Sequence, residues 1–171
     1  YDGMDYYNYD IENRLVKSTK LDDTGFLVQL SYDPNGRLFQ ISSNTGGTRQ
    51  FLYDGNALVA EYSGSTLQKR YVHGDQVDEP WVQYNSASIS ATERRYLHAN
   101  HQGSIIAHSN STGAVVNTLA YDAYGIPASA NVGSFAYTGQ VWIKELGMYH
   151  YKARVYAPKM GRFLQTDPIG Y

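Results

Sequence analysis

A Tyr-Asp pair recurs along this chain, and its spacing restricts the fold more than any other feature. The pair stands at Tyr9-Asp10 and again, 23 residues later, at Tyr32-Asp33, and in both places an Arg-Leu pair follows four residues after the aspartate. Weaker copies begin at Tyr53-Asp54 and Tyr121-Asp122. Self-similarity at such a period predicts an array in which each unit is one supersecondary element stacked on its neighbours.

The second copy predicts that each unit is a β-hairpin. An apolar and aromatic run, Leu27–Tyr32, enters the turn sequence Asp33-Pro34-Asn35-Gly36, and a second run starts at Arg37. Proline presets φ for a first turn position, Asn-Gly accepts positive φ, and the Asp33 carboxylate can accept hydrogen bonds from amides in the turn. Leu38 and Ile41 do not share a period of two, so we expect a bulge or an early strand end there.

Composition supports an all-β fold. The chain has 17 Tyr and 16 Gly in 171 residues, and no convincing helical period extends over ten or more residues. Tyrosine favours half-buried pleated surfaces, and glycine supplies turns. Truncating an array of hairpins leaves open edges, and these predict pairing with the rest of a parent chain or with other copies of this one.

Charge and residue content exclude several classes of function. With 14 Lys+Arg against 16 Asp+Glu, the chain has no cationic field for nucleic acid or an anionic membrane surface. It has no Cys, its five His are not spaced as a ligand set, and no apolar stretch is long enough to span a membrane. We therefore expect no metal and no cofactor.

The second half resembles a known family. Residues 96–125, ending in Tyr121-Asp122-Ala123-Tyr124-Gly125, and residues 135–170, with Gly161-Arg162-Phe163 and then Asp167-Pro168-Ile169-Gly170, are similar to the core segment of Rhs (YD-repeat) proteins. We thus expect a spiral or solenoid of antiparallel β-hairpins, a fragment of a YD-repeat shell with an inward-curling C-terminal core segment. The expected division is 1–95 for the hairpin repeats and 96–171 for the core segment, within one continuous sheet architecture.

The resemblance assigns a structural role to the residues of these phrases. They are Tyr9, Asp10, Tyr32, Asp33, Gly36, Arg37, Tyr53, Asp54, Tyr121, Asp122, Gly139, Arg154, Gly161, Arg162, Phe163, Pro168 and Gly170. One departure from the family pattern is Asn100, which stands where Asp is more usual.

The function that the resemblance implies is a β-shell that encloses and delivers a C-terminal toxin or effector payload. Implied partners are the payload domain and its immunity protein in the parent. The implied location is secreted or cell-surface, or cytoplasmic before export. The chain opens Tyr1-Asp2-Gly3 without an initiator Met, which suggests a piece of a longer polypeptide.

The resemblance also implies a catalytic candidate, because self-cleavage in the family is attributed to aspartates around Asp-Pro-Ile-Gly and around a second such phrase downstream. Asp167 is the matching residue, and Arg162 is expected either to orient its carboxylate by a bidentate pair or to form a surface ion pair. An aspartyl mechanism needs two carboxylates that share a proton. We expect Asp167 to be a turn or cap residue in this chain, which is no enzyme by itself, and half of such a catalytic site in a longer parent is the alternative.

Two other functions remain open from the residues. Aromatic side chains could form stacking platforms of an extracellular carbohydrate-binding or adhesin module, with a glycan as partner; the candidates are Tyr6, Tyr7, Trp81, Tyr84 and Trp142. The open ends could instead make such units a self-assembling polymer.

Overall fold

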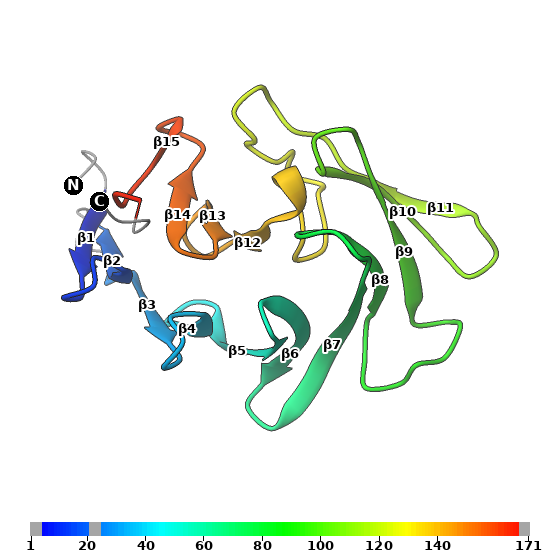
Figure 1. Ribbon diagram of the computed structural model, residues 1–171, viewed down its shortest axis with the longest axis horizontal. Helices are drawn as coiled ribbons and strands as arrows, with labels where there is room; N and C mark the ends of the chain where they lie inside the picture. The colour runs from blue at the N-terminus through cyan, green and yellow to red at the C-terminus, as the bar shows by residue number, and fades with distance from the viewer. Residues whose placement is uncertain (1–4, 21–24, 168–171) are drawn as a thin grey trace. The chain divides into compact units, whose positions relative to one another are not determined.

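The computed structural model describes residues 5–20 and 25–167 of the chain, which divides into two compact units. Unit 1 comprises residues 1–50 and 143–171, and unit 2 comprises residues 51–142. These boundaries differ from the expected division at 95/96, which separates repeats from core by sequence motif and stays a prediction. In Figure 1 the strands follow one another in the order of the chain.

The described structure is built from β-strands and one short 3-10 helix, in two antiparallel sheets of 11 and 4 strands. This confirms the all-β hairpin architecture predicted from the sequence. The larger sheet has the order β1 to β11 and the smaller one the order β12 to β15, so every neighbour in a sheet is a neighbour in sequence. The elements are β1 (Asp5–Tyr9), β2 (Leu15–Lys20), β3 (Leu27–Tyr32), β4 (Leu38–Ser43), β5 (Gly47–Asp54), β6 (Ala57–Ser63), β7 (Thr66–His73), β8 (Pro80–Tyr84), β9 (Arg94–Ala99), β10 (Ile105–Ser109), β11 (Val115–Thr118), η1 (Tyr137–Gly139), β12 (Val141–Ile143), β13 (Met148–Tyr151), β14 (Arg154–Ala157) and β15 (Arg162–Phe163).

Unit 1 joins the first hairpins to the C-terminal segment. In Figure 1, β14 and β15 lie near β1 and β2, although more than 130 residues separate them in sequence. Arg49 Nη2 and Glu145 Oε2 form an ion pair of 2.8 Å in which the glutamate is 4% exposed, and Asn13 donates to Thr166 Oγ1 at 3.0 Å. Burial of apolar area contributes most of the stability of such a unit. Its buried side chains include Leu15, Val28, Leu30, Leu38, Ile41, Ile143, Met148, Tyr149 and Val155.

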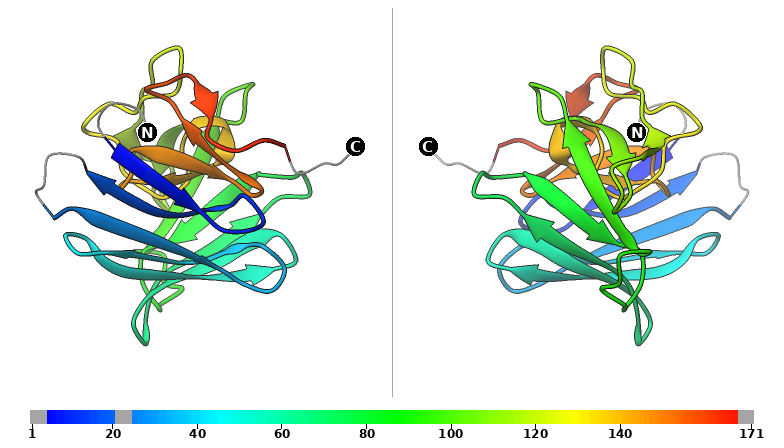
Figure 2. Two further views of the ribbon diagram at one scale, coloured as in Figure 1. Left: turned by 90° about the vertical axis from the view of Figure 1, so that its left-hand side faces the viewer. Right: turned by 90° about the vertical axis from the view of Figure 1, so that its right-hand side faces the viewer.

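Unit 2 is covered by the segment that follows β11. Phe135 packs edge to face against Tyr71 at 4.8 Å between ring centroids, and Lys69 Nζ donates to Ser134 Oγ at 2.9 Å. The Ile105 N–H donates to the Ala136 carbonyl at 3.0 Å, which fixes this segment to the start of β10. Figure 2 shows the green strands of unit 2 running side by side.

Two buried histidines lack a full set of partners. His150, on β13, is 6% exposed, and its Nε2 has no hydrogen-bond partner among the described residues. His108, on β10, is 2% exposed, and its Nε2 is likewise unpartnered within the described structure. Burial lowers the pKa of both imidazoles, that of His150 to about 4.

We predict that acid destabilises this fold through His150. The pKa of an unfolded histidine is about 6.5, so between that value and 4 the unfolded chain binds more protons, and stability falls as pH falls through this window. The expected loss between pH 7 and pH 5 is about 2 kcal/mol from this group. Urea unfolding of the wild type and His150→Phe at both pH values measures it.

His101→Phe is the matched control, because the His101 side chain is exposed on a turn. The control should keep the full pH dependence, whereas His150→Phe should have a weaker one. Equal pH dependence in all three proteins would show that burial of His150 is not the cause.

Candidate functional site

The second Tyr-Asp phrase forms a turn that one carboxylate holds together. Asp33 Oδ1 accepts hydrogen bonds from the N–H groups of Asn35 and Arg37, both at 2.9 Å. Asp33 Oδ2 accepts from Arg37 Nε at 2.7 Å and forms an ion pair with Arg37 Nη2 at 2.6 Å. Gly36 takes φ +77°, a conformation in which glycine has no steric penalty. A single side chain thus satisfies two backbone donors and one guanidinium.

The first phrase repeats this geometry. Asp10 Oδ1 accepts from the N–H groups of Glu12 and Arg14 at 3.0 and 2.9 Å, and Asp10 Oδ2 accepts from Arg14 Nε at 2.7 Å. Asn13 replaces the glycine at φ +60°, which asparagine tolerates. Both turns are therefore five-residue devices that begin at the aspartate and end at the arginine.

These hydrogen bonds determine the charge of the turn aspartates. Partial burial alone would raise the pKa of Asp10 and Asp33, but the hydrogen bonds from Arg14 and Arg37 and from backbone N–H groups outweigh it and lower the pKa. Both aspartates are therefore held as carboxylates in the folded chain.

Contacts between successive hairpins involve the tyrosine of the Tyr-Asp phrase. The Tyr32 hydroxyl donates to the Leu15 carbonyl at 2.8 Å, and the Arg14 guanidinium lies over the Tyr32 ring, 4.9 Å from its centroid. In unit 2 the Tyr121 hydroxyl donates to the Ile105 carbonyl at 2.9 Å. The acceptor is equivalent in the two contacts, because Leu15 and Ile105 each lie five residues after the Asp or Asn that begins a turn. Burial raises the pKa of both tyrosines, so they stay protonated donors.

Three further turns share the backbone part of this device, and two of them begin with asparagine. Asn100 Oδ1 accepts from the N–H groups two and four residues on, both at 3.0 Å, and Asn110 Oδ1 does the same at 3.0 Å. Asp122 Oδ1 accepts from Tyr124 and Ile126 at 2.9 and 2.8 Å. Sequence reasoning did not recognise the two asparagine turns as copies of the Asp33 device, although a glycine three residues after each asparagine was a usable signal.

The turn fixes the register of the strands on either side of it. In four of the turns the residue before the Asp or Asn pairs with the residue five after it, as in Tyr32↔Leu38 and Ala99↔Ile105, and the next residue is bulged out of the ladder. The bulge at Phe39 confirms the irregularity predicted between Leu38 and Ile41. It brings positions five and eight after the aspartate to the same face, so Leu38 and Ile41 are both 1% exposed.

The third phrase departs from this pattern. β5 ends at Asp54, and the tight turn Gly55-Asn56 leads directly into β6. Within the described part of the chain, no hydrogen bond to the Asp54 carboxylate occurs. The copy at Tyr53-Asp54 is thus a hairpin with a shorter turn. The residues after Asp54 accordingly do not match those after Asp10 and Asp33.

The C-terminal candidates lie together in unit 1. Asp167, whose side chain is 47% exposed, forms an ion pair with Arg154 Nη2 at 3.1 Å, and the Arg154 guanidinium lies 3.8 Å from the centroid of Phe163. The ion pair that the structure gives for Asp167 is to Arg154. A bidentate pair between Asp167 and Arg162 stays a prediction. Arg162 is exposed on β15. Burial raises the pKa of Tyr9, and the nearby Arg162 charge opposes that rise.

The remaining phrase residues occupy turns and close approaches. Gly161, at φ +63°, ends the turn between β14 and β15, and Gly139, at φ +72°, lies so close to the Asp78 carbonyl that a Cβ there would collide with it. Phe163 packs between Tyr151 and Tyr156 at 5.3 and 5.4 Å. Pro168 and Gly170 lie outside the described residues.

Two further features of the described residues concern metal ligands and membrane-spanning helices. Across residues 5–20 and 25–167, no three His, Cys, Asp or Glu side chains lie close enough to share a metal ion. No helix in the same part of the chain has the length and apolar character that crossing a membrane requires.

Comparison with known proteins gives a consistent result. The family model described as Teneurin YD-shell matches residues 3–171. The tRNA nuclease WapA of Bacillus subtilis (strain 168) is 31% identical over 176 residues, covering 98% of this chain and 7% of WapA. Salivary gland surface protein 1 of Aedes aegypti is 38% identical over 186 residues, covering 97% of this chain and 5% of that protein.

The fold has a counterpart among solved structures. In the crystal structure of TcdB2-TccC3-Cdc42, a region that is 20% identical superimposes with a TM-score of 0.71, covering 98% of this chain and 9% of that one. At this identity the likeness concerns the fold. The chain therefore spans less than a tenth of the length of each of these three proteins.

We predict that the stability of unit 1 depends on the Asp33 carboxylate. Asp33→Ala removes the acceptor of two backbone N–H groups and of Arg37, so the free energy of unfolding should fall by about 2–3 kcal/mol. Asp33→Asn keeps the backbone acceptor, as Asn100 and Asn110 do, and should cost about 1 kcal/mol. Urea unfolding followed by tyrosine fluorescence measures both.

Asp54→Ala is the matched control, since it removes the aspartate of the phrase that lacks this network. It should change the free energy of unfolding by less than about 0.5 kcal/mol. If Asp33→Ala and Asp54→Ala cost the same, the carboxylate network is not what stabilises the turn.

Proposed function

The chain belongs to the YD-shell family, and we propose that this structural shell segment helps a longer polypeptide to enclose and deliver a C-terminal effector or toxin payload. The segment is structural because its characteristic side chains, such as Asp10, Asp33 and Tyr32, hold turns and join neighbouring hairpins. The observation that carries the proposal is the return of the C-terminal segment to the first hairpins within unit 1, through Arg49–Glu145 and Asn13–Thr166.

The relatives support a payload elsewhere in the parent. WapA carries a nuclease name. Another relative is the double-stranded DNA deaminase toxin A of Burkholderia cenocepacia (strain H111), which is 23% identical over 96% of this chain. The matched region is 7% of the first and 14% of the second. Those names describe whole proteins, so for this chain a payload, its immunity partner and a secreted or cell-surface location are proposals.

The sheet edges give the parent chain a means of attachment. β1 and β11 end the order of the 11-stranded sheet, and β15 ends that of the smaller one. Edge strands offer backbone N–H and C=O groups to further strands. In the proposed function the flanking parts of the parent pair there, and other copies of this chain are the alternative partner.

We predict that the parent protein protects its payload from protease. In the purified full-length parent, with an epitope tag in the C-terminal region, added protease should cleave the payload at least tenfold more slowly than it cleaves the isolated payload. Replacing Asp10 and Asp33 together by Ala should open the shell and remove most of that protection, because both turns lose their carboxylates. Immunoblotting over time measures the rate.

The Asp54→Ala parent is the control and should protect as the wild type does. A payload that is cleaved equally fast in the intact parent and in isolation would contradict enclosure. It would leave the shell-family assignment of this segment untouched.

A second candidate function is half of an aspartyl self-cleavage site in the parent. The Asp167 carboxylate is half exposed, and it is oriented by Arg154, which in turn packs on Phe163. One carboxylate activates water while a second, from sequence outside this chain, would polarise the scissile amide. The same geometry also suits a purely structural ion pair.

We predict that Asp167→Asn abolishes cleavage of the parent downstream of residue 167, because the amide cannot activate water. Intact mass spectrometry of the purified parent reads out the products, and Asp122→Asn, which keeps its turn acceptor, is the control that should still be processed. Identical processing of wild type and Asp167→Asn would exclude a catalytic role for Asp167.

A further inference from the structure

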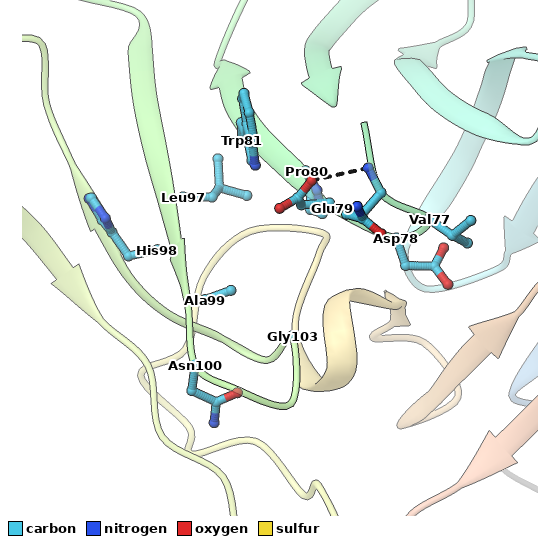
Figure 3. Close-up of a pocket in the computed structure, with 11 residues that line it drawn as sticks. Val77, Asp78, Glu79, Pro80, Trp81, Leu97, His98, Ala99, Asn100 and Gly103 are labelled. Carbon is cyan, nitrogen blue, oxygen red and sulfur yellow. Dashed lines mark hydrogen bonds between the residues drawn. The ribbon is translucent and has the colours of Figure 1, made fainter. Parts of the chain in front are cut away.

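An open pocket of about 450 Å³ lies in unit 2, at the end of the sheet where β8 begins and β9 finishes (Figure 3). Its walls come from the loop between β7 and β8 and from the turn that starts at Asn100. The residues that line it include Val77, Asp78, Glu79, Trp81 and Leu97. Pockets of this volume are of the size that holds small ligands or single side chains.

The pocket exists because one hairpin turn is replaced by a longer loop. The turn at Asn100 has the standard five-residue geometry, whereas β7 and β8 are joined by residues 74–79, closed by the Gly74 N–H donating to the Glu79 carbonyl at 2.8 Å. The loop is held by Gln140, whose Nε2 donates to Asp78 Oδ2 at 2.8 Å, and by the close approach of Gly139 to the Asp78 carbonyl. The walls are therefore fixed by contacts on both sides.

Trp81 forms the aromatic wall of the pocket. It is 52% exposed, and its ring packs against the backbone of Gly74, where a Cβ would lie 2.5 Å from Trp81 Cε2. A register shift between β7 and β8 leaves Trp81 out of the ladder, because Val72 pairs with Val82 and His73 with Pro80. Leu97, which also lines the pocket, is 8% exposed. Backbone contact thus positions the indole while half of its surface stays open to solvent and to the pocket.

Carboxylates supply the polar side. Glu79 Oε2 accepts a hydrogen bond from the Gln76 N–H at 3.2 Å, and Figure 3 shows the carboxylate turned toward Trp81 and Leu97. The Asp78 carboxylate, which accepts from Gln140 Nε2, adds a second negative charge to the loop, and no Lys or Arg occurs among the described residues that line the pocket. The His98 ring points away from the pocket, and its Nε2 lies 2.7 Å from Ser109 Oγ.

We propose that this pocket binds an arginine side chain of a partner polypeptide. A guanidinium is attracted to the face of an aromatic ring, most strongly to that of tryptophan, and its planar fork of donors matches a carboxylate. Trp81 and Glu79 present this pair of groups side by side. Lysine, a compact and strongly hydrated cation, stacks less well, and anionic ligands would meet two like charges.

The charge of the lining separates this ligand from the neutral sugar that the sequence suggested for Trp81. A neutral sugar would leave the Glu79 charge without a counter-charge, and the labelled residue nearest Trp81 besides Glu79 and Pro80 in Figure 3 is the apolar Leu97. Because a carboxylate beside an aromatic ring favours a cation, a guanidinium uses both Glu79 and Trp81.

The test is an NMR titration of the whole chain with argininamide at low salt. The chain has two tryptophans, Trp81 and Trp142, so its indole N–H signals are assigned with one Trp81→Phe variant. The Trp81 signal should shift saturably while the Trp142 signal stays in place. Raising the salt to 0.5 M should weaken binding at least threefold, and lysinamide should bind more weakly than argininamide.

Two carboxylate variants sharpen the test. Glu79→Gln should weaken argininamide binding at least fivefold, and Asp75→Asn, in the same loop but outside the lining, should leave it unchanged. A dispersed amide spectrum confirms that each variant is folded. A capped Gly-Arg-Gly peptide should shift the same signal, because the proposed source is a polypeptide.

Three outcomes would overturn the proposal. One is a saturable shift with maltotriose and none with argininamide, which would make the pocket a sugar site. Another is an equal response to argininamide and glycinamide, which would remove the guanidinium from the explanation. The third is unchanged affinity in Glu79→Gln. None of them bears on the shell function, which rests on unit 1 and the turns.

Discussion

The rest of this structure depends on one interaction, a side-chain oxygen that accepts two backbone N–H groups at the start of a turn. At Asp33 that oxygen binds the N–H groups two and four residues on, and it does so again at Asp10, Asn100, Asn110 and Asp122. Since buried or half-buried backbone donors must be satisfied, this acceptor fixes the length of the turn. Fixed length gives fixed register, and register decides which side chains face the core.

The bulge after the turns that begin at Asp10, Asp33 and Asn100 explains a pattern that strict alternation does not allow. After Asp10 and Asp33, the residues at positions five and eight are both buried: Leu15 and Ser18, and Leu38 and Ile41. In the hairpin repeat that starts at Asn100, the same two buried positions hold Ile105 and His108. A histidine thereby occupies a core position of the repeat, and its pKa is lowered by burial for that reason.

Where the chain departs from the repeat, a shorter turn or a longer loop replaces the standard five-residue turn. Asp54 introduces a two-residue turn, and residues 74–79 form a loop whose contacts with Gly139 and Gln140 leave an open pocket beside Trp81. Natural sequences follow local rules closely except where function or strain requires otherwise. The regular turns therefore account for the shell, while the irregular loop is the place where a ligand can be recognised.

The sequence by itself determined the hairpin repeat, the turn that Asp33 and Gly36 build, and the bulge near Leu38, because these follow from local chemistry at fixed spacing. It did not identify Asn100 and Asn110 as the same device, since an amide was not recognised as equivalent to the carboxylate. Only the tertiary structure decided that Arg154 accompanies Asp167, that Arg14 stacks on Tyr32, and that Trp81 faces a pocket. Such contacts join residues far apart in the chain, and their geometry depends on how separate strands pack, which no local pattern specifies.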